Sequence, residues 1–168
     1  MKCFYPLLVL FLFVQWSLGA TPLWNGANSG MTVPQVMEKF QGSVVPVDPS
    51  KLATGATEKV RIQSFKYLGR EFLVRFYFVE NGLMQVSLHI KDPGKRGELV
   101  QIVDAISKEL SLSFGSPKCQ AADNGASLTL QRSWDSTNPR VSIVAVCFGP
   151  TDELYDGGFL NLNYQAAR

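Results

Sequence analysis

Two alternating segments joined by a short turn constrain the fold of this chain most strongly. Residues 70–79 and 83–90 are rich in Val, Phe, Leu and Ile, and apolar residues occupy every second position, as in a half-buried strand. Glu80-Asn81-Gly82 separates the two segments. A short turn containing Asn-Gly between alternating segments predicts a β-hairpin.

The register of this hairpin decides which side chains share a face. A two-residue Asn-Gly turn would place Phe76 opposite Ser87, whereas a three-residue loop with a left-handed Gly82 places it opposite Val86. A one-residue slip exchanges the two faces, so only the three-residue loop gives a consistent apolar side. We expect that side to carry Phe72, Val74, Phe76, Phe78, Met84, Val86, Leu88 and Ile90. The opposite side then carries Arg75, Tyr77, Gln85, Ser87 and His89.

Two segments have helical patterns. Thr32-Val33-Pro34-Gln35 has the form of a capping box with Pro in the first turn, and Gly42 is expected to stop this first helix. A longer helix is predicted from about Glu98 to Phe114, because its apolar residues recur every three or four positions. Gly115-Ser116-Pro117 then ends it.

The remaining alternating segments complete a predicted α+β fold. Strands are expected at 60–66, 70–79 and 83–90 after the first helix, and at 127–134, 140–148 and 159–164 after the second. This order predicts two helix-plus-three-strand units, with the helices packed on one face of an antiparallel sheet. We expect one domain over 21–168, with pseudo-repeats at about 24–92 and 97–166.

The first twenty residues predict a secretory signal peptide. Lys2 is followed by an apolar run from Phe4 to Val14, and Ser17-Leu18-Gly19-Ala20 supplies small residues for cleavage. The run is about half of the ~20 residues that span a bilayer, and no later stretch is long and apolar enough. We expect a secreted protein of the bacterial periplasm, with no membrane span after cleavage.

The cysteines agree with an oxidising compartment. Cys3 lies in the predicted signal peptide, which leaves Cys119 and Cys147. An even number of cysteines in a secreted chain predicts a disulfide between them.

Composition and charge exclude two classes of protein. Hydrophobic residues make up 46% of the 168 residues, which excludes a chain that is mainly disordered. The formal net charge of +2 leaves little positive charge for phosphates, so nucleic acid is not an expected partner.

No motif of an enzyme, metal or cofactor site is present. His89 is the only histidine, so a site with several histidine ligands is impossible. No Gly-x-Ser-x-Gly accompanies it, although His89 or a pair of carboxylates remains a possible hydrolytic centre. Residues 151–156 include three acidic residues, and whether they bind an ion stays open. We predict no catalytic residue, no metal and no cofactor.

Three short motifs resemble a known unit of bacterial envelope proteins. Residues 30–36 (GMTVPQV), 76–78 (FYF) and 82–86 (GLMQV) are similar to the helix-then-hairpin unit of the BamE/SmpA-type outer-membrane lipoproteins and of the beta-lactamase-inhibitor-protein-like group. The resemblance implies a binding module without a catalytic site, whose open sheet face binds other envelope proteins. Two features depart from the lipoprotein pattern: no Cys is available for lipidation, and no Pro stands directly after Gly42.

Three functions follow as hypotheses. The first is a secreted or periplasmic, non-enzymatic module that binds another envelope or secreted protein through Arg75, Tyr77, Gln85, Ser87 and His89. The second is a small secreted hydrolase that uses carboxylates or His89. The third is a carrier that holds a small apolar ligand between helices and sheet. The oligomeric state is left open.

Overall fold

The computed structural model describes residues 20–149 and 157–167. Residues 1–19 of the predicted signal peptide and the acidic loop 151–156 therefore lie outside the described residues.

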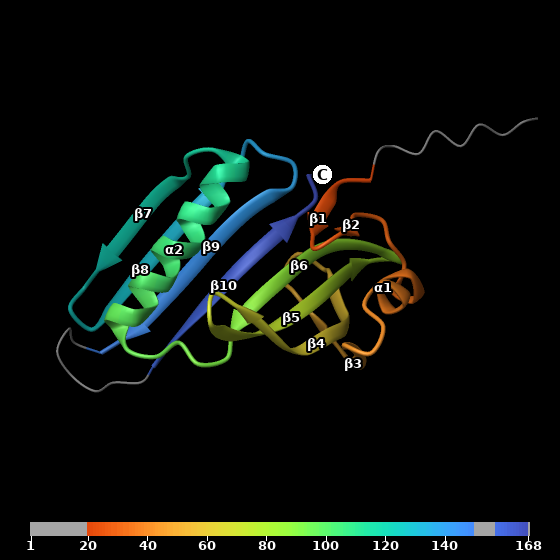
Figure 1. Cartoon of the computed structure of the whole chain (residues 1–168), viewed down its shortest axis with the longest axis horizontal. Coiled ribbons are helices and arrows are strands. Elements are labelled where there is room, and N and C mark those ends of the chain that lie inside the picture. The colour runs from red at the N-terminus through yellow and green to blue at the C-terminus, as the bar shows by residue number, and fades with distance from the viewer. Residues whose placement is uncertain (1–19, 150–156, 168) are drawn as a thin grey trace, which may run out of the picture.

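One antiparallel sheet of eight strands forms the body of the molecule (Figure 1). Its spatial order is β3-β4-β5-β6-β10-β9-β8-β7, so two four-strand meanders meet where β6 pairs with β10. The strands are β3 (Val44–Lys51), β4 (Thr57–Tyr67), β5 (Arg70–Val79), β6 (Gly82–Ile90), β7 (Lys118–Asp123), β8 (Ser127–Trp134), β9 (Arg140–Phe148) and β10 (Gly158–Gln165).

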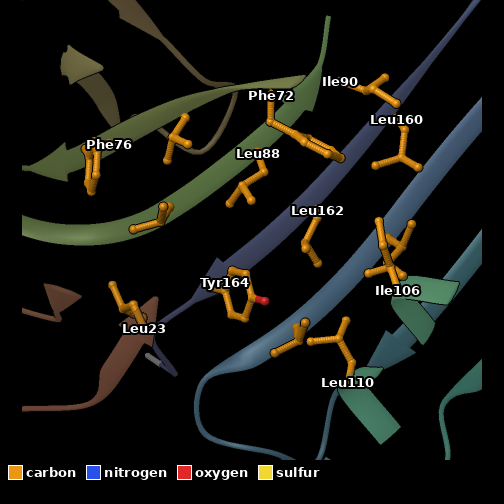
Figure 2. Packing of buried hydrophobic residues seen from close by; sticks show 14 of the residues in the cluster. Leu23, Phe72, Phe76, Leu88, Ile90, Ile106, Leu110, Leu160, Leu162 and Tyr164 are labelled. Carbon is orange, nitrogen blue, oxygen red and sulfur yellow. The ribbon is translucent and has the colours of Figure 1, made fainter. Parts of the chain in front are cut away.

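One face of this sheet is covered by two separate layers. Helix α2 (Arg96–Phe114) lies over β8 and β9, whereas the short helix α1 (Val33–Lys39) and the small ribbon of β1 (Pro22–Trp24) and β2 (Ala27–Asn28) lie over the other half (Figure 1). A single buried cluster joins both layers to the sheet. Figure 2 shows its centre, where Phe72 and Leu88 of the first meander lie near Leu160 and Leu162 of β10.

The predicted fold class is wrong. Within the described residues the chain forms ten strands and only two helices, so the protein is mainly β rather than two helix-plus-three-strand units. The expected strands and helices form, but β3 and β7 extend the sheet at both edges. Strand β3 was not predicted because it contains Pro46 and Pro49, and proline argues against a strand. An edge strand tolerates both prolines because one side of its backbone needs no hydrogen-bond partner. All six residues of β7 are exposed, so β7 has no apolar alternation.

The hairpin has the predicted faces but a different turn. Phe76 pairs with Val86, Val74 with Leu88 and Phe72 with Ile90, as expected, but the expected pair of Phe78 with Met84 does not form. However, the turn consists of Glu80 and Asn81, and Glu80 rather than Gly82 is left-handed, with φ of 54°. A bulge in the pairing between Tyr77 and Phe78 brings Phe78 opposite Leu83. The extra residue of the bulge, Met84, restores the alternation that the three-residue loop was expected to provide.

The predicted disulfide is also wrong. Cys119 and Cys147 are free thiols, one exposed and one buried. Cys119 pairs with Arg132 and Cys147 with Leu128, so β8 lies between the two cysteines and they are offset along it. Two strand spacings of about 4.8 Å already separate them by roughly 10 Å, beyond the roughly 7 Å that a disulfide allows between Cα atoms.

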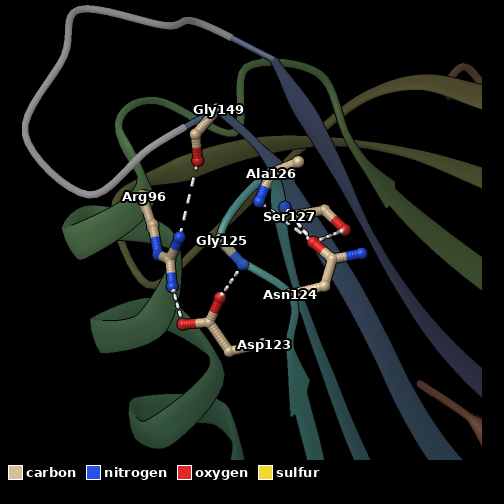
Figure 3. A network of polar contacts seen from close by, with 7 residues as sticks. All are labelled: Arg96, Asp123, Asn124, Gly125, Ala126, Ser127 and Gly149. Atoms are coloured by element: carbon tan, nitrogen blue, oxygen red, sulfur yellow. Dashed lines mark hydrogen bonds and ion pairs between the residues drawn. The ribbon is translucent and has the colours of Figure 1, made fainter.

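The start of α2 is fixed to the far edge of the sheet. Arg96 forms an ion pair with Asp123 at the end of β7, and its Nη1 donates to the Gly149 carbonyl at 3.4 Å (Figure 3). Asp123 also accepts a hydrogen bond from the Gly125 amide at 3.0 Å. This bond, together with Arg96, lowers the pKa of Asp123. The same residues therefore position the helix and form the turn that joins β7 to β8.

Candidate functional site

The sheet face turned away from both helices carries all five residues predicted for binding. Tyr77 lies opposite Gln85, Arg75 opposite Ser87 and Leu73 opposite His89, and directly opposed residues point to the same side. Strand β10 continues the face with Asn163 beside Ser87 and Asn161 beside His89. We call this side the open face; its polar part consists of Glu58, Arg61, Arg75, Tyr77, Gln85, Ser87, His89, Asn161 and Asn163.

The five predicted residues differ in how much a partner could touch. Tyr77 and Ser87 are each only 2% exposed, so they support the face from within. Gln85 and His89 are half-buried, and the Arg75 side chain is 31% exposed. Direct contact with a partner is therefore open to Arg75, Gln85 and His89, and the part that these residues play in binding stays a prediction.

A fully buried carboxylate holds the arginines of the open face. Glu58 Oε1 accepts from Arg61 Nε at 2.7 Å, and Glu58 Oε2 accepts from Ser50 Oγ at 3.0 Å and lies 3.8 Å from Arg75 Nη1. Simple alternation would place Glu58 on the same side as Val60. The pairing of β4 with β5 is irregular between these two residues, which turns Glu58 to the open face instead. This bulge is why the sequence pattern did not reveal Glu58.

The centre of the open face is positively charged. Two arginines, Arg61 and Arg75, accompany the single carboxylate of Glu58. Burial, and then the positive charge of Arg75, lower the pKa of His89 from 6.5 to about 4, so the imidazole is neutral at pH 7. The ion-paired group therefore holds two cations and one carboxylate, and the exposed Asp48 of β3 faces Arg61 across a hollow.

Side-chain hydrogen bonds extend the face across β6, β10 and β9. Gln85 Nε2 donates to Ser87 Oγ at 2.8 Å, and Ser87 Oγ donates to Asn163 Oδ1 at 2.7 Å. Asn163 Nδ2 in turn donates to Ser142 Oγ at 3.4 Å. Because these bonds engage Ser87, its buried hydroxyl is not placed as a nucleophile for His89.

Three buried polar atoms near this network have no hydrogen-bond partner: Arg75 Nε, His89 Nε2 and Asn161 Oδ1. They are the only such side-chain atoms in the described part of the chain. Asn161 lies beside His89 and partly offsets the fall in the pKa of His89, but the two atoms do not meet with hydrogen-bond geometry. An unpaired buried polar group costs about 1–3 kcal/mol, so each one calls for water or a bound group.

Apolar side chains border these unpaired atoms on the side of β9. Asn161 lies opposite Val144, and the same side of the sheet continues through Val146, Phe159 and Phe148. Phe148 is 49% exposed and Phe159 39% exposed. We call Val144, Val146, Phe148 and Phe159 the apolar strip. Sequence alternation could not reveal it, because residues 141–148 are apolar at nearly every position.

A shallow hollow of about 560 Å³ lies at the other end of the open face. Pro46, Val47 and Asp48 of β3 form its wall, and Arg61 of β4 faces them. The irregular pairing of β3 with β4 between Pro46 and Ser50 creates this hollow. It offers room for a side chain beside the guanidinium of Arg61.

The comparisons with known proteins add no relative. No family model matches this sequence, and it matches neither a curated protein nor a solved structure. Among residues 20–149 and 157–167, no three His, Cys, Asp or Glu side chains come together as a metal site. The described helices include none with the length and hydropathy that crossing a bilayer requires.

Proposed function

We propose that this protein is a non-enzymatic module, secreted or periplasmic, that binds another envelope or secreted protein through the open face. One observation carries the proposal: the partly exposed Arg75, Gln85 and His89 lie on the same side of the sheet as the exposed Phe148 and Phe159. Protein interfaces combine such aromatic and arginine anchors with polar groups around them.

The charge of the face indicates the chemistry of the partner. The two arginines beside Glu58 favour an acidic side chain, which would pair with the exposed part of the Arg75 side chain. Phe148 and Phe159 favour apolar side chains next to it. The partner is therefore a protein surface that combines carboxylates with apolar residues.

Matched variants test this function. Arg75→Gln removes a cation from the open face, and Glu58 keeps its closer partner Arg61. Phe159→Ala removes an exposed ring. Lys108→Gln and Leu112→Ala are the controls, because they make comparable changes at exposed positions of α2.

The readout is quantitative affinity capture from envelope extract, with thermal unfolding to check that each variant is folded. We expect a protein that the wild type and both controls recover equally, and that Arg75→Gln and Phe159→Ala each recover at least tenfold less. Equal recovery by all five proteins would reject the open face as the binding surface.

A further inference from the structure

A pocket of about 340 Å³ lies on the opposite side of the sheet, between α2 and the β1–β2 ribbon. Its floor is the sheet, from which Tyr67 and Tyr164 rise, and its sides come from Leu23 of β1 and Leu110 of α2. Figure 2 shows Tyr164 between those two leucines. The pocket exists because two separate layers cover this face, and a gap remains where they approach each other.

Half of the residues that line the pocket are aromatic. Trp24 stands edge-on to Phe65, with ring centroids 5.0 Å apart, and Phe114 at the end of α2 closes the far side. A pocket of this volume with aromatic walls is typical of sites for small organic molecules. The walls alone would suit any apolar or aromatic body.

Glu109 gives the pocket its selectivity. It is the only charged residue that lines the pocket, and no cation pairs with it within the described residues. Glu109 lies close enough to the Tyr67 hydroxyl to influence its titration. Burial first, and then the nearby Glu109 carboxylate, raise the pKa of Tyr67; burial and the charge of Glu109 raise the pKa of Tyr164. Both hydroxyls therefore stay protonated, and the single formal charge facing the pocket is negative.

We propose that this pocket binds a small organic cation, with an aromatic or alkyl body among the rings and an ammonium group at Glu109. Trp24 and Phe65 line the same pocket and can add a second attraction, because an aromatic ring attracts a cation over its face. The carboxylate rejects an acid of the same size, since two negative charges would meet beside apolar walls. This site is on the other side of the sheet from the open face and does not depend on the proposed function.

Calorimetric titration with two probes of the same skeleton tests the charge. Tryptamine carries an ammonium group and indole-3-propionate a carboxylate on a similar chain. We expect tryptamine to bind with a dissociation constant below about 1 mM and indole-3-propionate at least tenfold more weakly. Failure of tryptamine to bind, or equal binding of both probes, would overturn the proposal.

Two variants then test whether the carboxylate of Glu109 is the charge that binds the ammonium group. Glu109→Gln keeps the shape of the side chain and removes its charge, whereas Glu38→Gln makes the same change at an exposed position of α1 outside the pocket. We expect Glu109→Gln to weaken tryptamine binding at least fivefold and Glu38→Gln to change it less than twofold. Equal effects of the two variants would show that only overall charge matters and would contradict the site.

Discussion

The two halves of the sheet are covered in different ways. Six residues of α2 are buried on β8 and β9, whereas α1 buries only Val36. In the first half, aromatic side chains provide most of the cover. Trp24 of the ribbon and Phe40 after α1 both contact Phe76 of β5, at centroid distances of 6.2 and 5.3 Å. A helix of seven residues cannot cover four strands, so aromatic side chains supply the missing buried area.

The halves also differ on the open face. The first half carries the charged group of Glu58, Arg61 and Arg75, and the second half carries the apolar strip. The comparison shows that a sheet built from two similar meanders can combine charged and apolar recognition on one surface.

The aromatic cover of the first half predicts the largest effect. Phe76 is fully buried beneath Trp24 and Phe40, so Phe76→Ala is expected to lower the free energy of unfolding by about 4 kcal/mol. Chemical denaturation measures the loss. Amide hydrogen exchange should show lost protection in α1 and the β1–β2 ribbon while α2 keeps its protection. Equal loss in α2 would mean that the two covers are not independent.

The buried carboxylate predicts the next effect. Glu58→Gln leaves Arg61 and Arg75 without their anion, and we expect a loss of about 3 kcal/mol in the free energy of unfolding. Asp104→Asn is the matched control, because Asp104 pairs with Arg132 at 3.6 Å with an exposed carboxylate and should cost less than about 1 kcal/mol. Urea denaturation compares the two variants. Similar losses would show that the burial of Glu58 has no energetic importance.

His89 predicts a smaller, pH-dependent effect. Its pKa is about 4 in the folded protein against an ordinary value of 6.5, so between these values the unfolded chain binds a proton that the folded chain does not. The contribution of His89 to stability is therefore complete above pH 6.5 and decreases as the pH falls to about 4. Burial first, and then the charges of Arg75 and Arg61, lower this pKa, while Glu58 and Asn161 oppose them.

Urea midpoints at pH 7 and pH 4.5 measure this contribution. His89→Gln should lose less stability between the two pH values than the wild type, because the carboxylates titrate equally in both proteins. If the wild type and His89→Gln lost the same stability between the two pH values, the pKa of His89 in the folded protein would not be lowered.

The cysteines predict the smallest effect. Because Cys119 is exposed and unbonded, Cys119→Ser should change the free energy of unfolding by less than about 0.5 kcal/mol. A thiol reagent should modify Cys119 in the native protein, whereas Cys147 is buried and has a raised pKa, so it should react only on unfolding. If Cys119→Ser lowered the free energy of unfolding by several kcal/mol, the result would contradict the free thiol and support the disulfide between Cys119 and Cys147.

Sequence reasoning succeeded where one periodicity dominates. The stripe of α2 and the alternation of β5 and β6 predicted those elements and the side of the sheet on which Arg75 and His89 lie. It failed where a local irregularity changes the pattern. Bulges moved Glu58 to the open face and shortened the turn at Glu80, because a bulge depends on the partner strand and leaves no separate signal in its own sequence.

Edge strands and continuous apolar runs were the other limits. Pro46 and Pro49 concealed β3, since proline argues against a strand unless the strand is known to be at an edge. The apolar strip is invisible in residues 141–148, because both sides of β9 are apolar there and only the fold shows which side α2 covers.

Site-specific photo-crosslinking tests most directly whether the open face binds a protein. A photoreactive residue replaces Gln85 in the middle of the open face or, as the matched control, the exposed Gln101 on α2, and each protein is irradiated in the cells that naturally produce it. The account predicts one discrete crosslinked product from position 85 and none from position 101. Equal crosslinking at both positions, or a product only from position 101, would contradict it.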